Sequence, residues 1–203
     1  MFETLVNAFK TKEIRIKIWA TLAMILVYRI GCYIPVPTLN SAVLSTLLSG
    51  NDFLSLLSTI TGGSLQNATL FSLGILPFIN AFIIMQLLTL VVPALERMSK
   101  EGDEGRRKMT QITRFVAIAL AIIQAIGIVV GLKSAIRPIF GFETAEAPAL
   151  TMTLTIIILV GGSIMVMWLS ERITEYGIGN GTSIIIFIGI LATAGTMMAE
   201  SFK

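Results

Sequence analysis

The side chains that usually carry chemistry are scarce in this sequence. It contains no histidine and a single cysteine, Cys32, so a serine–histidine triad, a histidine-bearing zinc site and an internal disulfide are excluded within it. Asp52 and Asp103 are the only aspartates and lie outside the long apolar segments, which excludes an intramembrane aspartyl dyad. The serine of Gly161-Gly162-Ser163 has no base to activate it, and small residues at a helix contact explain this triplet better. With no phosphate-binding glycine loop either, the sequence predicts a protein that is not an enzyme and holds no metal or cofactor.

A second group of residues with binding potential lies inside the apolar segments. Asn80 and Gln86 share one segment with Pro77, and Gln124 lies in another. Isolated polar residues at membrane depth more often join helices than contact a substrate. Pro77 removes a backbone donor, so we expect it either to kink a helix or to break one that lines a binding site. Arg29 lies near the end of its segment, where we expect its side chain to snorkel toward the outer membrane surface.

The whole chain of 203 residues is far more apolar than a soluble domain. Hydrophobic residues make up 55% and charged residues 13%, against about 25% charged residues in typical soluble domains. The mean hydropathy is +0.86. So few charges could not cover a water-facing surface, and the sequence therefore indicates an all-α, polytopic membrane protein.

Apolar segments of membrane-spanning length recur along the chain, because a helix needs roughly 20 apolar residues to cross a bilayer. We expect five spans, at about 18–35, 70–92, 113–132, 149–170 and 182–199. Residues 53–95 contain no charged side chain, which is about twice the length of one crossing. The break at Gly62-Gly63-Ser64 leaves residues 53–65 as an apolar piece that is too short to cross.

The basic residues around these segments predict the topology. Lys10 to Lys17 precede the first span and Arg97 to Arg114 follow the second, and short loops of this kind face the cytoplasm. An even number of crossings must then separate them, so residues 53–65 should form a re-entrant or outer-face segment. We expect an amphipathic cytoplasmic segment at 1–17 and place residue 203 at the outer face. Irregular backbone at membrane depth needs a protein-lined cavity, which favours a channel or a transporter.

Two long stretches resemble a known family. Gly62–Thr89 (GGSLQNATLFSLGILPFINAFIIMQLLT) is similar to the first signature of the SecY family, and Trp168–Ser183 (WLSERITEYGIGNGTS) is similar to its second. Arg29–Pro37 matches the ending of the family's first helix, although Thr38 stands where glycine is commoner. Members of this family are central subunits of protein-conducting channels. They have ten spans in two inverted halves, so the resemblance implies that this chain is the first half.

The resemblance also implies roles for particular residues. It suggests that one pair of isoleucines on each of two helices contributes to a pore ring, that residues 53–65 form a plug, and that three polar residues face a lateral gate. The pore-ring residues are Ile75, Ile79, Ile186 and Ile190; the plug residues are Phe53, Leu54, Leu56, Leu57, Ile60, Gly62 and Gly63; the gate residues are Asn80, Gln86 and Gln124. The implied function is a passive, gated conduit that passes unfolded secretory polypeptides and releases hydrophobic segments laterally into lipid.

The same resemblance implies a setting and a set of partners. These are the plasma (inner) membrane and its lipid, the subunits SecE and SecG, the SecA motor, the ribosome, the insertase YidC, and secretory or membrane polypeptides as substrates. No nucleic acid-binding motif is present. The alternative is a secondary transporter with a broken-helix solute site, which usually needs an intramembrane carboxylate. None of the five expected spans has an aspartate or glutamate away from its ends, which counts against that alternative.

Overall fold

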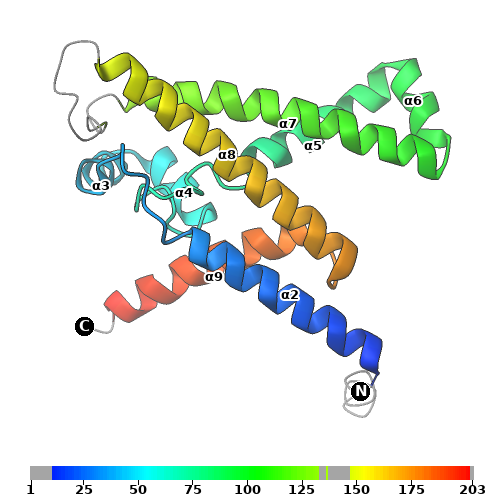
Figure 1. Cartoon of the computed structure of the whole chain (residues 1–203), viewed down its shortest axis with the longest axis horizontal. Coiled ribbons are helices and arrows are strands. Elements are labelled where there is room, and N and C mark those ends of the chain that lie inside the picture. The colour runs from blue at the N-terminus through cyan, green and yellow to red at the C-terminus, as the bar shows by residue number, and fades with distance from the viewer. Residues whose placement is uncertain (1–10, 133–135, 137–146, 202–203) are drawn as a thin grey trace.

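The computed structural model describes residues 11–132, 136 and 147–201, and throughout these residues the regular secondary structure is helical. In chain order the helices are α2 (Lys12–Gly31), α3 (Ser41–Ser49), α4 (Asp52–Ile60), α5 (Leu76–Val91), α6 (Pro93–Lys100), α7 (Asp103–Gly131), α8 (Ala147–Tyr176) and α9 (Gly181–Ser201). Figure 1 shows the long helices crossing one another around the short helices α3 and α4. The all-α prediction is therefore confirmed for the described residues.

Two of the described helices, α7 and α8, are long and apolar enough to cross a membrane. The pair α5 and α6 would supply a third crossing if it is counted as one broken span, although the two helices meet at 103°. The apolar part of α9, Gly181–Gly195, is shorter. Helix α2 begins at Lys12, so the basic end of the expected 1–17 segment continues into the first expected span. Residues 1–10 of that segment lie outside the described part of the chain.

Residues 61–75 form a series of turns instead of the first part of the span expected at 70–92. Gly62, Gly63 and Gly74 have φ values of +68°, +81° and +56°, and Ala68 also has a positive φ, 52°. Such angles cannot continue a right-handed helix, which is why α5 begins only at Leu76. Pro77 lies in the first turn of α5, where its missing N–H has no helical acceptor to lose. The expectation that Pro77 kinks or breaks a helix from within is wrong.

The bend in this region lies instead between α5 and α6, where Val92 is extended and Pro93 starts α6. The basic stretch that we expected as a loop is largely helical, because Arg106 and Arg114 belong to α7. On α6 the Lys100 ammonium contacts Glu96 at 2.6 Å and holds the pKa of that exposed carboxyl below its usual range, since hydrogen bonding and charge both favour the ionised form.

The turns at 61–75 are the buried centre of the molecule. The hydroxyls of Thr69 and Ser72 each lie 3.1 Å from the carbonyl oxygen of Ser64, so the turns are held by their own side chains. Phe71 stacks on Tyr28 of α2, with the ring centroids 5.8 Å apart. On the other side Gly162 of α8 approaches the Leu70 carbonyl so closely that a Cβ would overlap it. The small residue at Gly162 therefore does permit a close contact, as predicted for Gly161-Gly162-Ser163, but with the backbone of these turns and not with another helix.

Candidate functional site

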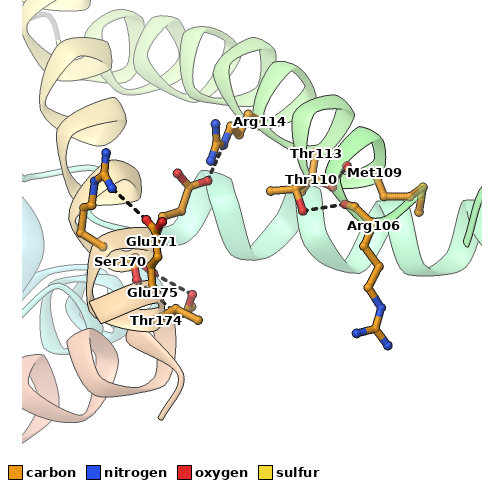
Figure 2. A network of polar contacts seen from close by, with 11 residues as sticks. Arg106, Met109, Thr110, Thr113, Arg114, Ser170, Glu171, Thr174 and Glu175 are labelled. Atoms are coloured by element: carbon orange, nitrogen blue, oxygen red, sulfur yellow. Dashed lines mark hydrogen bonds and ion pairs between the residues drawn. The ribbon is translucent and has the colours of Figure 1, made fainter. Parts of the chain in front are cut away.

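An open cavity of about 740 Å³ lies between the N-terminal half of α7, the C-terminal end of α8 and the start of α9. Its polar lining comes from Arg107, Thr110, Arg114, Ser170, Glu171, Thr174, Glu175, Asn180, Thr182 and Ser183, and its apolar lining from Phe78, Ile79 and Phe82 of α5. The wall formed by α7, α8 and α9 is therefore polar and charged, while the wall formed by α5 is apolar. Figure 2 shows several of the charged side chains at this cavity.

The acidic groups of the cavity are paired with arginines. The Arg114 Nε on α7 lies 2.6 Å from the Glu171 Oε1 on α8 (Figure 2). The Arg172 Nη1 lies 2.8 Å from the Glu175 Oε2. Arg172 also lies over the rings of Trp168 and Tyr176. Both carboxylates that line the cavity therefore have cationic partners.

Hydroxyl groups hold the turn between α8 and α9. Thr174 Oγ1 accepts a hydrogen bond from the Gly181 N–H at 2.8 Å, and the hydroxyls of Ser170 and Thr182 lie 2.9 Å apart. Thr21 of α2 accepts from the Ile178 N–H at 3.1 Å. A side chain at Gly181 would overlap the Ser170 carbonyl, so glycine is required at this close approach. These bonds fix where α9 begins and therefore which of its residues reach the cavity.

Three of the four predicted pore-ring isoleucines meet in one apolar cluster, and one of them, Ile79, also lines this cavity. Ile75 is buried in an apolar cluster, and Ile79 and Ile186 pack against the same cluster while remaining partly exposed. Ile190 lies outside this cluster and is 44% exposed. Thr182, one helical turn before Ile186, lines the cavity together with Ile79. Sequence reasoning that looked only for isoleucine missed Thr182, although its spacing from Ile186 places both on one face.

The segment predicted as a plug contains α4 and the first glycine turns. Leu54 and Leu57 pack into the apolar cluster formed with α3 and the turns, whereas Leu56 is 63% exposed. Ile60 is partly buried at the C-terminal end of α4, and Gly62 and Gly63 follow it. The side chain of Phe53 lies outside the described part of the structure. Helix α4 packs against α9, where Thr193 Oγ1 donates to the Thr59 carbonyl at 3.3 Å.

Arg29 does not snorkel toward a membrane surface, so that expectation is wrong. Its guanidinium donates a hydrogen bond to the main-chain carbonyl of Ile188 on α9 and is partly buried. The side chain turns inward because α9 passes close enough to offer an acceptor, which the sequence around Arg29 could not indicate.

The predicted gate residues lie on two helices that pack along each other, α5 and α7 (Figure 1). Asn80 and Gln86 are exposed on α5, and Gln124 is half-buried on α7. Gln86 lines a second, mainly apolar cavity of about 360 Å³ between these helices, together with Met85 and Thr89. Gln124 is not part of that lining, so the structure does not bring all three residues to one place.

Long apolar helices, a cavity with one polar wall and one apolar wall, and a short helix packed against α9 are features of a helical membrane protein of the channel type. The SecY family model matches residues 69–203. The Protein translocase subunit SecY of Staphylococcus carnosus is 42% identical over 204 residues, which cover 100% of this chain and 47% of that protein. The corresponding protein of Staphylococcus aureus strain NCTC 8325 is 41% identical over 194 residues, covering 95% and 44%.

The chain belongs to the SecY family and corresponds to its N-terminal half, as the sequence predicted. It spans about half the length of the curated relatives that it matches. Solved structures agree: Sec61 in a canine ribosome–channel complex from the endoplasmic reticulum has a TM-score of 0.62 and 28% identity, covering 88% of this chain and 37% of that one. A SecY structure concerned with the plug domain has a TM-score of 0.59 and 27% identity, covering 90% and 38%. Nothing in these matches supports the transporter alternative.

Proposed function

We propose that this chain is the first half of a passive, gated channel that passes unfolded polypeptides across the membrane and releases apolar segments sideways into lipid. One observation carries the proposal, the order of features along α9. Thr182 and Ser183 line the polar cavity, Ile186 packs in the apolar cluster, and Gly189 and Thr193 contact the α4 segment. In our proposal these three sites are, in order, the entrance of the channel, its constriction and the contact with the plug. At a rise of about 1.5 Å per residue, the helix from Thr182 to Thr193 is roughly 16 Å long.

An apolar constriction suits this task for a physical reason. Branched aliphatic side chains offer water no hydrogen bonds, so a narrow ring of them dewets and blocks ions while remaining deformable. It also has no charge or fixed donor with which to hold a passing chain. In our proposal Ile75, Ile79 and Ile186 form this half of the ring, and Ile190 forms its outer edge. A conduit of this kind performs no covalent chemistry, so we propose that the chain is not an enzyme.

The membrane arrangement follows from the same proposal. Five spans cross the plasma (inner) membrane, with the N-terminus in the cytoplasm and residue 203 at the outer face. Residues 53–65, including α4, form a plug that does not cross. The packing of α4 against the middle of α9 supports this arrangement, because a helix of nine residues docked there is far shorter than a crossing.

A side exit for apolar segments requires a gate that opens reversibly. We assign Asn80, Gln86 and Gln124 to this gate, which faces the second half of the channel. Hydrogen bonds between polar side chains in a membrane contribute only about 0.6 kcal/mol on average, so a gate of this kind opens readily. Burying apolar area in lipid contributes about 25 cal/mol per Å², which favours release of a hydrophobic segment through it.

The partners in this proposal act on the cytoplasmic face or from the side. A ribosome or the SecA motor would supply direction, SecE and SecG would complete the channel, and YidC would receive membrane segments. The canine relative was solved in a ribosome–channel complex, which supports the ribosome as a partner. Exposed basic residues on α6 and α7, including Arg97, Lys100 and Arg106, offer a cytoplasmic surface for such contacts.

Crosslinking of a stalled secretory chain tests the proposal. Ile79→Cys and Ile190→Cys are placed one at a time in a full-length SecY-type chain that carries these residues and has Cys32→Ser as background. We expect the stalled chain to crosslink strongly at position 79 and more weakly at 190. Leu90→Cys, which is 82% exposed near the end of α5, is the control. Crosslinks at Leu90 with none at Ile79 or Ile190 would overturn the proposal.

A further inference from the structure

The α4 segment and α9 meet at two glycines. A Cβ built on Gly62 would lie 3.1 Å from the Cα of Gly189, and a Cβ on Gly189 would lie 2.6 Å from the carbonyl oxygen of Ile60. Both distances are too short for a carbon atom to be accommodated without movement of one backbone. The absence of a side chain at position 189 therefore allows the end of α4 to rest directly on the α9 backbone.

Arg29 of α2 reaches the same crossing from another side. Its guanidinium donates to the carbonyl of Ile188, the residue before Gly189. A Cβ on Gly62 would lie 3.4 Å from the Arg29 Nη1, so the guanidinium also lies beside the turn that ends α4. One turn further along α9, Thr193 donates to the Thr59 carbonyl at 3.3 Å. Two elements that are distant in sequence, α2 and the α4 segment, thus converge on residues 188–193 of α9.

From this convergence we infer that Arg29 and Gly189 form a latch that holds the α4 segment in its closed position. The inference rests on the proposed function and names the contacts that keep the α4 segment, the proposed plug, in place. Arg29 fixes α9 against α2 through a charged donor, and charge-assisted hydrogen bonds are stronger than neutral ones. At Gly189 no side chain stands between the two backbones, so the end of α4 can separate from α9 at this point without a rotamer change. Movement of α9 away from α2 therefore releases both contacts together.

The test uses a full-length SecY-type chain that carries these residues, assembled with its partner subunits and reconstituted in lipid bilayers. Gly189→Ala adds one methyl group where the Ile60 carbonyl leaves no room. Overpacking by one methyl is typically large enough to shift an equilibrium by about tenfold, so we expect the resting ion conductance to rise by about that factor. Gly195→Ala is the matched control, because a Cβ there meets nothing within 4 Å on the same helix.

Arg29→Met provides a second, independent variant, since it removes the donor while keeping an apolar side chain of similar length. It should raise the resting conductance as well. It should also accelerate maleimide labelling of Ile60→Cys from the outer side, in a Cys32→Ser background. Labelling of a released segment reports its position directly, so this measurement does not depend on how well ions pass.

Deletion of residues 53–65 distinguishes a failure of the latch from a failure of the proposed channel function. One outcome is that the deletion variant conducts ions at rest while Gly189→Ala and Arg29→Met assemble normally and show no rise in resting conductance. In that case the latch is wrong and the channel proposal stands. If Gly195→Ala leaks as much as Gly189→Ala, general loosening of α9 explains the result and the latch is again wrong. A deletion that produces no conductance in an assembled complex overturns the channel proposal and the latch with it.

Discussion

Gly162 on α8 lies against the main-chain carbonyl of Leu70 so closely that a Cβ at this position would overlap the carbonyl. The next residue, Ser163, places its hydroxyl 3.3 Å from the carbonyl oxygen of Gly74. Helix α8 therefore packs on the backbone of the central turns as well as on their side chains. This contact positions the turns that lead into α5, and with them Ile75 and Ile79.

A larger residue at Gly162 should separate α8 from these turns. We expect Gly162→Val to destabilise the folded protein by about 1–3 kcal/mol or more, the usual cost of overpacking. Gly161→Val is the control, because Gly161 is exposed and a Cβ there meets nothing within 4 Å. Thermal unfolding of the full-length complex in detergent measures the difference. Equal shifts in Tm for the two variants would contradict the close contact described for Gly162.

Removing the buried hydroxyl of Thr38 and removing that of Thr155 should lower the Tm by different amounts. Their oxygens lie 2.7 Å apart, both residues are fully buried, and Thr155 also bonds to the Thr151 carbonyl at 2.7 Å. Thr38→Val leaves the Thr155 hydroxyl with a partner, whereas Thr155→Val removes the partner that the structure describes for Thr38. An orphaned buried hydroxyl costs about 1–3 kcal/mol, so we expect Thr155→Val to lower Tm more than Thr38→Val. The Tm of the double variant should lie between those of the two single variants or above both. A lower Tm for Thr38→Val than for Thr155→Val would contradict the prediction.

The ion pair between Arg114 and Glu171 should contribute little to stability despite its short distance of 2.6 Å. The side chains are 46% and 20% exposed, and pairs of this kind typically contribute about 0.2–1 kcal/mol. A double-mutant cycle with Arg114→Met and Glu171→Gln should give a coupling energy in that range that falls as salt is raised. A coupling energy of several kcal/mol that is insensitive to salt would show that the pair is desolvated.

The Thr21 hydroxyl should protect the turn between α8 and α9. It accepts a hydrogen bond from the Ile178 N–H at 3.1 Å, and Ile178 lies in this turn, 157 positions away in sequence. Thr21→Val keeps the shape and removes the acceptor, so hydrogen exchange in a peptide covering residues 177–181 should become faster. Thr46→Val on α3 is the control, because that hydroxyl bonds only locally, to the Ala42 carbonyl. Unchanged exchange at 177–181 would mean that the other hydroxyls, Ser170 and Thr174, hold the turn alone.

Much of the fold follows from local sequence. The apolar segments that we expected at 113–132 and 149–170 lie within α7, to within one residue at its end, and within α8, because hydropathy is a property of neighbouring residues and needs no tertiary information. The short piece expected at 53–65 includes nearly all of α4, and the helix ends there because Gly62 and Gly63, which have no Cβ, adopt positive φ angles. The two signature stretches were also sufficient to identify the family.

Contacts between distant helices decided the rest. The sequence placed Arg29 near a membrane surface, but α9 offers it the Ile188 carbonyl and draws it inward. Spacing placed Ile186 and Ile190 on one face, but only Ile186 packs in the apolar cluster, because the contact with α4 begins at Gly189. Composition and periodicity thus determined which segments are apolar and helical. Which side chains meet depended on how the helices cross. A crossing is set by close backbone approaches at single glycines, and the local sequence does not show which glycines make them.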